Sequence, residues 1–437
     1  MAQCPRMPET AKSRFPPSIK FLAWNEAAER FSYYGMASIL VLHMVRNLGF
    51  AENEAVTAYQ VFTGAVYLMP IFGALLADRY WGRYNTILWL SLGYVAGHAV
   101  LAVWESAWGL LVGLSLISIG AGGLKPCASA FAGDQIPADD KGLLARLYDL
   151  YYWMINLGST VSTIVIPLLL DHVSPRVAFG VPGVAMAVAL VVFWLGRGRY
   201  VHVPPARVAP PAEDGGPGRG SAAGAVLRIL AVFAPVIVFW ALFFQYGSSW
   251  TLQAERMDRH VLGFQIAAGN VQTLDAGMVL TFIPVFAVWV FPALERRGVK
   301  VTALRKMTVG MFVTVLSFVA AGAVESALQG GAALHVAWQI PQYVFLVIGE
   351  VLVSVTALEF AFSQAPKHLR SVVMGLWYVT ISAGSLLTAL VAWLNRFQGV
   401  AYYAFFAAMM LAAAFVFAAV ARWYRPVEAA PSAEAAA

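Results

Sequence analysis

The chain has 437 residues, of which 60% are apolar and only 12% are charged. A soluble domain carries about 25% charged residues, so the apolar surplus exceeds what a water-soluble core needs and must face lipid. The formal net charge is +6. The basic residues are nevertheless scattered through short loops without a basic patch or basic helix, which argues against nucleic acid as a partner.

The two cysteines do not suggest a disulfide framework or a zinc site, because Cys4 lies in a polar N-terminal segment and Cys127 in an apolar stretch. We find no zinc motif, nucleophile elbow or phosphate-binding loop, and therefore expect neither an enzyme nor a bound cofactor. A cleavable signal peptide is not expected either, because the first apolar stretch is long, contains polar residues and lacks a cleavage site of small residues.

A bilayer crossing needs about 20 mostly apolar residues, and the chain contains twelve such stretches. They are expected at about 21–46, 58–78, 84–104, 108–132, 145–170, 178–196, 227–253, 273–294, 302–322, 336–361, 370–394 and 400–421. Prolines inside the spans, such as Pro70, Pro126, Pro167 and Pro284, are tolerated where neighbouring helices satisfy the freed carbonyls.

The distribution of Lys and Arg predicts the orientation in the membrane. Most of these 29 residues lie on the side that holds the N-terminus and the alternate loops. The opposite side has only Arg46, Arg176, Arg256, Arg259 and Arg396. The positive-inside rule therefore places both termini in the cytoplasm, and the even number of spans agrees with that. We expect a multi-pass protein of the cell membrane (inner or plasma membrane).

A Pro/Gly-rich segment divides the spans six and six. Residues 197–226 contain PPARVAPPAEDGGPGRGSAAG, a composition typical of a flexible linker. The predicted order is a cytoplasmic segment (1–20), a six-helix bundle (21–196), this cytoplasmic linker, a second six-helix bundle (227–424) and a disordered cytoplasmic tail (425–437). This organisation predicts an all-α membrane protein of the major facilitator fold, with a substrate site between the halves.

The first span carries charges that are costly in a bilayer, about 2.5–3.5 kcal/mol each on insertion scales. Glu26, Glu29, Arg30, Tyr33 and Tyr34 follow one another at helical spacing in NEAAERFSYYGM, which puts all five on one helix face. This face predicts the polar wall of a cavity. The alternative is a self-neutralising cluster that only fixes helix packing.

Two ionisable residues lie deep in later spans. Lys125 follows glycines that permit close helix contact and precedes Pro126, which opens the backbone locally; the alternative is a lysine that snorkels to an interface. Glu350 lies well inside span ten, with Ser354 one turn later. Lys125 and Glu350 belong to opposite halves, so they could pair across the cavity, hold the two ends of a zwitterion, or form a purely structural bridge.

Asp275, at the start of span eight, either lies inside the membrane or caps the helix at the outer surface. Glu359, near the cytoplasmic end of span ten, is expected to be structural. In the loop after span two, ADRYWGRYNT, the charged residues Asp78, Arg79 and Arg83 surround a glycine turn. Such a loop suits a cytoplasmic clamp that holds one conformation.

The sequence resembles the proton-dependent oligopeptide transporter family of the major facilitator superfamily through most of the chain. The ExxER motif of the family appears as Glu26, Glu29 and Arg30, followed by FSYYG. Further matches, in the family's order, are Tyr67, GGLKP with FAGDQ, YYWMINLGS with Tyr152 and Asn156, FWALFFQYGSSWTLQA with Gln245, PQYVFLVIGE with EFAFSQAP, and Trp377 in GLWYVT.

The chain departs from the family pattern at three positions. Phe244 stands where span seven commonly has an acid, and Asp275 stands where span eight commonly has an asparagine. Gln60 stands where many animal members carry a histidine. The linker is also too short for the two extra helices of many bacterial members. We expect Asp275 to take over the gating contact of the missing acid, unless it only caps span eight in water.

The resemblance, together with the residue chemistry, implies a monomeric symporter that imports di- and tripeptides with protons. Glu350 would hold the peptide amine, and Arg30 and Lys125 its carboxylate. Protons would be handled by Glu26 and Glu29, with Arg30, Glu350 and Asp275 in the coupling machinery. The other implied contacts with substrate are Tyr33, Tyr34, Tyr67, Tyr152, Asn156, Gln245, Ser354 and Trp377. Alternatives are a transporter of this fold for nitrate or an amine drug, and a peptide sensor that does not transport.

Overall fold

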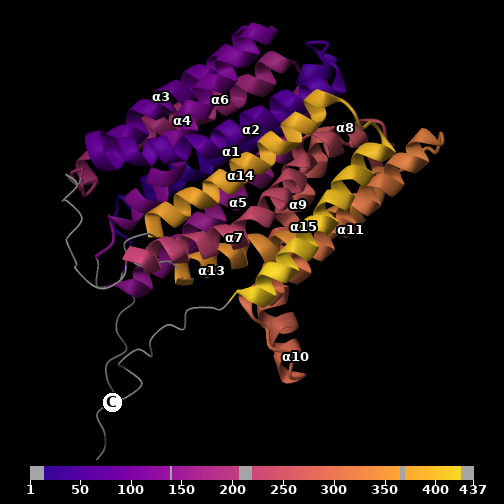
Figure 1. Cartoon of the computed structure of the whole chain (residues 1–437). Coiled ribbons are helices and arrows are strands. Elements are labelled where there is room, and N and C mark those ends of the chain that lie inside the picture. Colours follow the sequence, from indigo (N-terminus) through magenta and orange to yellow (C-terminus); the bar gives the residue numbers. More distant parts are fainter. Residues whose placement is uncertain (1–13, 138–139, 206–218, 365–369, 425–437) are drawn as a thin grey trace, which may run out of the picture.

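The computed structural model describes residues 14–137, 140–205, 219–364 and 370–424, and Figure 1 follows the chain through two helical bundles. The helices of the first bundle are α1 (Ile19–Arg46), α2 (Glu52–Leu76), α3 (Gly82–Val103), α4 (Ala107–Gly133), α5 (Lys141–His172) and α6 (Pro175–Leu195). A π-helical turn, η1 (Ala77–Trp81), joins α2 to α3, and the short η2 (Gly196–Arg199) follows α6.

The second bundle has several interrupted helices. The first runs through α7 (Arg219–Phe243), η3 (Phe244–Gly247) and α8 (Ser249–Glu255). A small antiparallel hairpin, β1 (His260–Val261) with β2 (Phe264–Gln265), and η4 (Ala268–Gln272) lead to α9 (Thr273–Val285), η5 (Phe286–Val290) and α10 (Phe291–Arg296). Then come α11 (Ala303–Gln329), η6 (Val336–Gln339), α12 (Ile340–Glu350), η7 (Val351–Val355), α13 (Thr356–Gln364), α14 (Arg370–Leu394) and α15 (Val400–Trp423).

Ten helical segments in the described part of the chain are long and apolar enough to cross a membrane. One of them, Glu52–Val103, contains both α2 and α3, and the chain turns between them at Gly82, whose φ is +73°. The polar helix α1 is not among the ten, because its charged face lowers its hydropathy. With α1 added and α2 and α3 taken separately, the segments correspond to the twelve predicted spans.

Large apolar side chains face outward along these helices, as expected for a protein whose solvent is lipid. Examples are Phe72, Val184 and Phe415, which are 56%, 65% and 61% exposed. The four prolines singled out in the sequence lie inside α2, α4, α5 and α9. The glycines of α4 permit close contact with α2, because a Cβ atom on Gly122 would lie 2.7 Å from Cβ of Met69.

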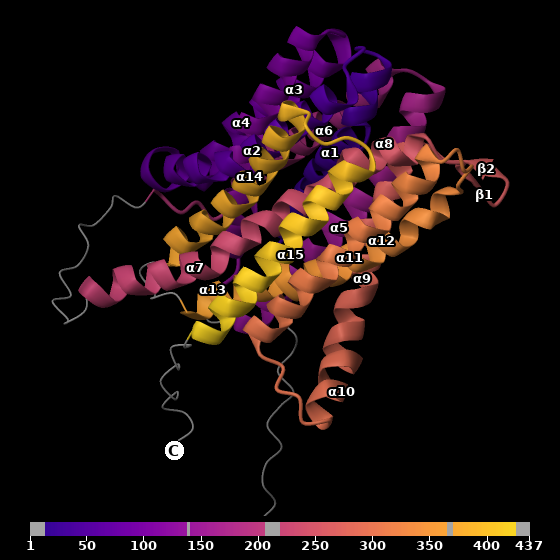
Figure 2. The ribbon, with the colours of Figure 1, turned by 45° about the vertical axis from the view of Figure 1, so that its right-hand side comes forward.

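The two bundles meet along α2 and α14, which lie side by side in Figures 1 and 2. We call the end where α1 begins and α15 ends the terminal end, and the opposite end the distal end. Further contacts between the bundles join α1 and α5 to η3, α8, η4 and α9, and many of them involve the distal ends of α1, α5, α8 and α9. The bundles are therefore fastened together at the distal end.

The expected linker, 197–226, overlaps with helix at both ends, since η2 covers 196–199 and α7 begins at Arg219. Residues 206–218 lie outside the described part, as do 1–13 with Cys4 and the tail 425–437. The expected structural role of Glu359 also falls on a side chain outside the description.

Candidate functional site

The charged face predicted for the first span lies inside the protein. Glu26 and Glu29 on α1 are 6% and 1% exposed. The guanidinium of Arg30 donates from Nε to Oε1 of Glu26 over 3.0 Å and lies 2.6 Å from Oε2 of Glu29. One cation is thus shared by two carboxylates of the same helix.

Lys125 lies between two aromatic rings. Its Nζ atom is 4.4 Å from the ring centroid of Tyr33 on α1 and 4.1 Å from that of Tyr67 on α2. Both distances suit a cation–π interaction. Lys125 is also within electrostatic range of Glu29 and Arg30, but the described residues offer it no ion pair. A lysine held between α1 and α2 does not snorkel to a membrane interface.

The second bundle contributes two carboxylates. Glu350 is the last residue of α12, directly before the π-helical turn η7 that contains Ser354. Asp275 lies in the first turn of α9. The two carboxylates interact electrostatically. Oε2 of Glu350 and Oδ1 of Asp275 are both buried, and neither has a hydrogen-bond partner among the described protein groups. A capping carboxylate would accept a backbone N–H, which Asp275 does not do through Oδ1.

Two tyrosines of the first bundle link these carboxylates to the charges of α1. Tyr34 interacts electrostatically with Arg30 and Glu29 on its own helix and with Asp275 and Glu350 across the bundle interface. Tyr152 on α5 also interacts with Glu350. We call this group the central polar cluster; its members are Glu26, Glu29, Arg30, Tyr33, Tyr34, Tyr67, Lys125, Tyr152, Asp275 and Glu350.

Aromatic side chains adjoin the central polar cluster. The ring of Tyr67 lies 5.2 Å from that of Phe244 and 6.5 Å from that of Tyr378. Phe244 stacks on Trp240 at 5.7 Å, and Trp240 meets Trp377 edge-to-face at 5.6 Å. Phe244, at the position where the resemblance predicts an acid, therefore contributes its ring to this aromatic group.

Two predicted binding residues have hydrogen bonds within their own helical segments. Gln245 is fully buried; its Nε2 donates to the carbonyl of Ala241 (2.9 Å), and its Oε1 accepts from Ser249 (3.0 Å). Asn156 Nδ2 donates to the carbonyl of Tyr152 over 2.8 Å. In this conformation both amides therefore stabilise local backbone.

Gln60 and Phe244, two of the three departures from the family pattern, are in contact. Gln60 on α2 is fully buried, and its Nε2 donates to the carbonyl of Phe244 (3.2 Å) and to Oγ of Ser248 (3.1 Å). These hydrogen bonds connect the bundles at η3. Gln60 and Phe244, which the resemblance marks as departures from the family pattern, thus meet at one interface, and the sequence alone did not indicate this contact.

The loop expected to clamp one conformation lies at the terminal end. Asp78 and Arg79 are exposed in η1. Arg83, at the start of α3, forms an ion pair with Asp134 at the end of α4, with 2.6 Å between Nη1 and Oδ1. This contact lies within the first bundle, so in this conformation it does not join the bundles.

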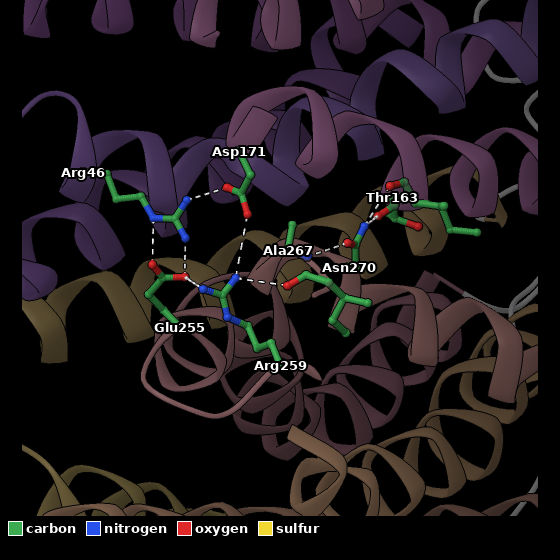
Figure 3. A network of polar contacts seen from close by, with 9 residues as sticks. Arg46, Thr163, Asp171, Glu255, Arg259, Ala267 and Asn270 are labelled. Atoms are coloured by element: carbon green, nitrogen blue, oxygen red, sulfur yellow. Dashed lines mark hydrogen bonds and ion pairs between the residues drawn. The ribbon is translucent and has the colours of Figure 1, made fainter. Parts of the chain in front are cut away.

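A charged network at the distal end joins the bundles instead, and the sequence analysis missed it. Arg46 of α1 contacts Asp171 of α5 at 2.6 Å and also pairs with Glu255 of α8. Arg259 lies 3.7 Å from Asp171 and 3.5 Å from Glu255. Figure 3 shows the four side chains pointing toward one another. We call them the distal network. A usable signal was that Arg46 and Arg259 are two of the few cations on that side.

Further hydrogen bonds beside the distal network connect the same elements. Asn270 Nδ2 donates to the carbonyls of Thr163 and Ile164, each over 2.8 Å, as Figure 3 shows for Thr163. Gln272 donates to the carbonyl of Ser38 at 3.3 Å. The distal end is thus closed by ion pairs and by backbone carbonyls of α1 and α5.

These features define a multi-pass, all-helical membrane protein of the major facilitator fold, with charged groups held between two bundles. Residues 84–213 and 221–403 match the family PTR2, described as the POT family. The chain belongs to this family, which is a family of transporters and not of enzymes.

Relatives and solved structures agree with that assignment. Peptide transporter family 1 of Drosophila melanogaster is 38% identical over 73% of this chain and 49% of its own length. Human solute carrier family 15 member 2 is 36% identical over 73% of this chain and 50% of its own length. The chain thus spans about half the length of these curated relatives. The crystal structure of an auto-inhibited POT family peptide transporter is 35% identical, covers 96% of this chain and 99% of its own, and superposes with a TM-score of 0.87.

Proposed function

We propose that this protein is a proton-coupled symporter that imports di- and tripeptides by alternating access. The observation that carries the proposal is the separation of charge in the central polar cluster. Arg30 and Lys125 belong to the first bundle and Glu350 to the second, with Tyr34 between them. A short peptide carries fixed opposite charges at its ends, so it complements this arrangement.

The proposed roles follow from charge. Glu350 binds the peptide amine, and Arg30 and Lys125 bind its carboxylate. Polar and aromatic contacts to the rest of the peptide come from Tyr33, Tyr34, Tyr67, Tyr152, Asn156, Gln245, Ser354 and Trp377. Asn156 and Gln245 would have to exchange their present hydrogen bonds for contacts with substrate. The amine and the carboxylate of a bound peptide would supply Glu350 and Lys125 with the ion-pair partners that the described residues do not offer.

Protons are proposed to bind at Glu26 and Glu29, where protonation frees Arg30 to hold the substrate carboxylate. Asp275 and Glu350 form a second acidic pair, and two like charges in a poorly solvated site repel each other. One proton that moves down a potential of about 100 mV releases about 2.3 kcal/mol, enough for a roughly fifty-fold solute gradient. One or two protons per peptide therefore suffice for accumulation.

The proposed cycle alternates between closure at the two ends. The distal network fastens the distal end in the present conformation, and Asp78, Arg79 and Arg83 would contribute to closure at the terminal end. If both termini are cytoplasmic, as the Lys and Arg distribution predicts, the present conformation is closed to the outside. The protein is proposed to work as a monomer in the cell membrane, with no cofactor beyond the proton gradient.

The names of relatives support the substrate class. Several curated relatives are peptide transporters. A solved relative that is 25% identical, with a TM-score of 0.83, is described as a peptide transporter in complex with alafosfalin. That ligand belongs to the relative, and it supports peptide-like substrates here.

The test is uptake of labelled dialanine into proteoliposomes, with and without an imposed pH gradient. We expect accumulation only with the gradient, and competition by unlabelled dialanine but not by alanine or nitrate. A peptide sensor would bind dialanine without accumulating it, and a transporter of another solute would show no competition. Either result would overturn the proposal.

A further inference from the structure

A deep crevice opens on the side of the second bundle, at its terminal end, away from the central polar cluster. Its volume is about 1320 Å³, and it lies between η5 and α10 on one side and α11, α12, α13 and α15 on the other. In Figures 1 and 2, α10, which forms one side of the crevice, runs away from the other helices. Drug-sized ligands occupy pockets of about 300–1,000 Å³, so this crevice suits a larger molecule.

The walls of the crevice are apolar over most of their length. They include Phe291 on α10, Val309 and Phe312 on α11, and Phe415 and Ala419 on α15. These side chains belong to membrane-spanning helices, and Phe415 is 61% exposed. The crevice is thus open to the hydrocarbon region of the bilayer, where lipid acyl chains can pack against its apolar walls.

The rim of the crevice is cationic. Lys300 lies in the connection between α10 and α11, Arg305 and Lys306 lie in the first turn of α11, and Arg422 lies in the last turn of α15. The described lining contains no acidic residue, and no ion pair within the described residues involves any of these four. Four cations therefore gather where the apolar walls reach the terminal end.

Two of these cations lie where a positive charge is unfavourable unless an anion is bound nearby. The N-terminus of a helix has a partial positive charge, so Arg305 and Lys306 in the first turn of α11 are unfavourable there, and an anion would be favourable. The local contacts do not neutralise them. Lys306 Nζ lies 4.7 Å from the ring centroid of Phe291 on the opposite wall, and Arg305 Nη1 donates to the carbonyl of Lys300 over 3.0 Å.

We propose that this crevice is a binding site for an anionic phospholipid from the leaflet at the terminal end. Its phosphate would contact Lys300, Arg305, Lys306 and Arg422, and its acyl chains would lie between α10 and α15. Basic pockets between membrane helices bind anionic headgroups in this way. A free phosphate would use only the rim and leave the apolar walls unfilled. The site is independent of the proposed transport, because no member of the central polar cluster lines it.

The test measures lipid binding to the full chain in detergent by native mass spectrometry. The probes are dioleoyl-phosphatidylglycerol, which is anionic, and dioleoyl-phosphatidylcholine, which has the same chains and no net charge. We expect at least about tenfold tighter binding of the anionic lipid. In the Lys306→Gln/Arg422→Gln variant, its dissociation constant should rise roughly thirtyfold, the factor for two cations at a membrane surface, with that of phosphatidylcholine unchanged.

The matched control is Arg296→Gln/Arg297→Gln, which removes two neighbouring cations at the end of α10, at positions that do not line the crevice. Lipid binding should be unchanged. A second variant, Ala419→Trp, fills the apolar wall and should weaken both lipids without removing charge. Equal affinity of the wild type for the two lipids, or equal losses in the two double variants, would overturn the proposal. Displacement of the lipid by millimolar glycerol 3-phosphate would also overturn it, since that result identifies a site for free phosphate.

Discussion

The distal network and the central polar cluster contain the same kinds of side chain but differ in how their charges are paired. In the distal network, Arg46 and Arg259 each meet both Asp171 and Glu255, and these side chains are partly exposed. In the central polar cluster, Lys125 and Glu350 lack any ion pair among the described residues. Paired charges at an interface stabilise one arrangement of the bundles, whereas unpaired charges in a buried site favour whatever ligand supplies the missing partner.

The energetic scales of the two regions differ accordingly. A partly exposed ion pair contributes about 0–1 kcal/mol, so each pair of the distal network adds little to the stability of the closed distal end. A buried charge that loses its partner costs about 3–5 kcal/mol. Substitutions in the central polar cluster should therefore have much larger effects than substitutions in the distal network.

The largest effect is expected from Glu26→Gln and Glu29→Gln. Glutamine keeps the shape of each side chain but cannot take up a proton, so gradient-driven accumulation of dialanine should be abolished while counterflow exchange continues. Proteoliposome assays of both modes measure this, with the exposed Glu295→Gln as a control that should behave like the wild type. Undiminished accumulation in both mutants would show that protons bind elsewhere.

Lys125→Ala and Glu350→Ala should each weaken dipeptide binding by about thirtyfold or more, because each removes the partner of one peptide terminus, at about 2–5 kcal/mol. Each variant should lose the preference for a free peptide over a peptide blocked at one terminus, and the terminus should differ between the two variants. Lys125→Ala should bind a free peptide and its C-terminal amide with equal affinity. Glu350→Ala should bind a free peptide and its N-acetyl form with equal affinity.

Isothermal titration of free, amidated and acetylated dialanine with each purified variant measures these affinities. If both variants lose affinity equally for the free and the blocked peptides, the assignment of Lys125 and Glu350 to the peptide termini is wrong.

Asp275→Asn tests whether the acid gained in span eight replaces the one lost at Phe244. The gating hypothesis expects a loss of gradient-driven uptake of at least about tenfold, since an unpaired charge in a poorly solvated site costs a few kcal/mol and about 1.4 kcal/mol is a factor of ten. Adding Phe244→Glu should recover part of the loss, because the ring of Phe244 adjoins Tyr67, which contacts Lys125. Near-normal uptake by Asp275→Asn alone would reject the hypothesis.

The smallest effect is expected from Arg46→Gln in the distal network. Arg46 is a partly exposed cation with two acidic partners, and its loss should cost about 1 kcal/mol. The population that is open at the distal end should therefore increase about fivefold. The increase should be smaller at high salt, which screens the ion pairs. Spin labels at Val173→Cys and Phe264→Cys, in a background with Cys4 and Cys127 replaced by Ser, report that population as a distance distribution. Arg396→Gln, an exposed cation outside the network, is the matched control. Equal distributions for the wild type and Arg46→Gln would show that the network does not hold the distal end closed.

The sequence by itself determined the features that depend on local spacing and hydropathy. The spans are continuous apolar stretches, and the charged face of α1 follows from the helical repeat, so both could be predicted without knowing what packs against them. Lys125 and Glu350 stood out because an ionisable residue in a membrane span is costly wherever it lies.

Only the tertiary structure decided which distant residues meet. Gln60 donates to the carbonyl of Phe244, Arg46 reaches Asp171 and Glu255, and Arg422 of α15 joins Lys300, Arg305 and Lys306 on the rim of one crevice. Each of these contacts joins helices that are far apart in the chain. They depend on where helices cross and end relative to one another, which is set by side-chain packing between the helices and not by the period of any one helix.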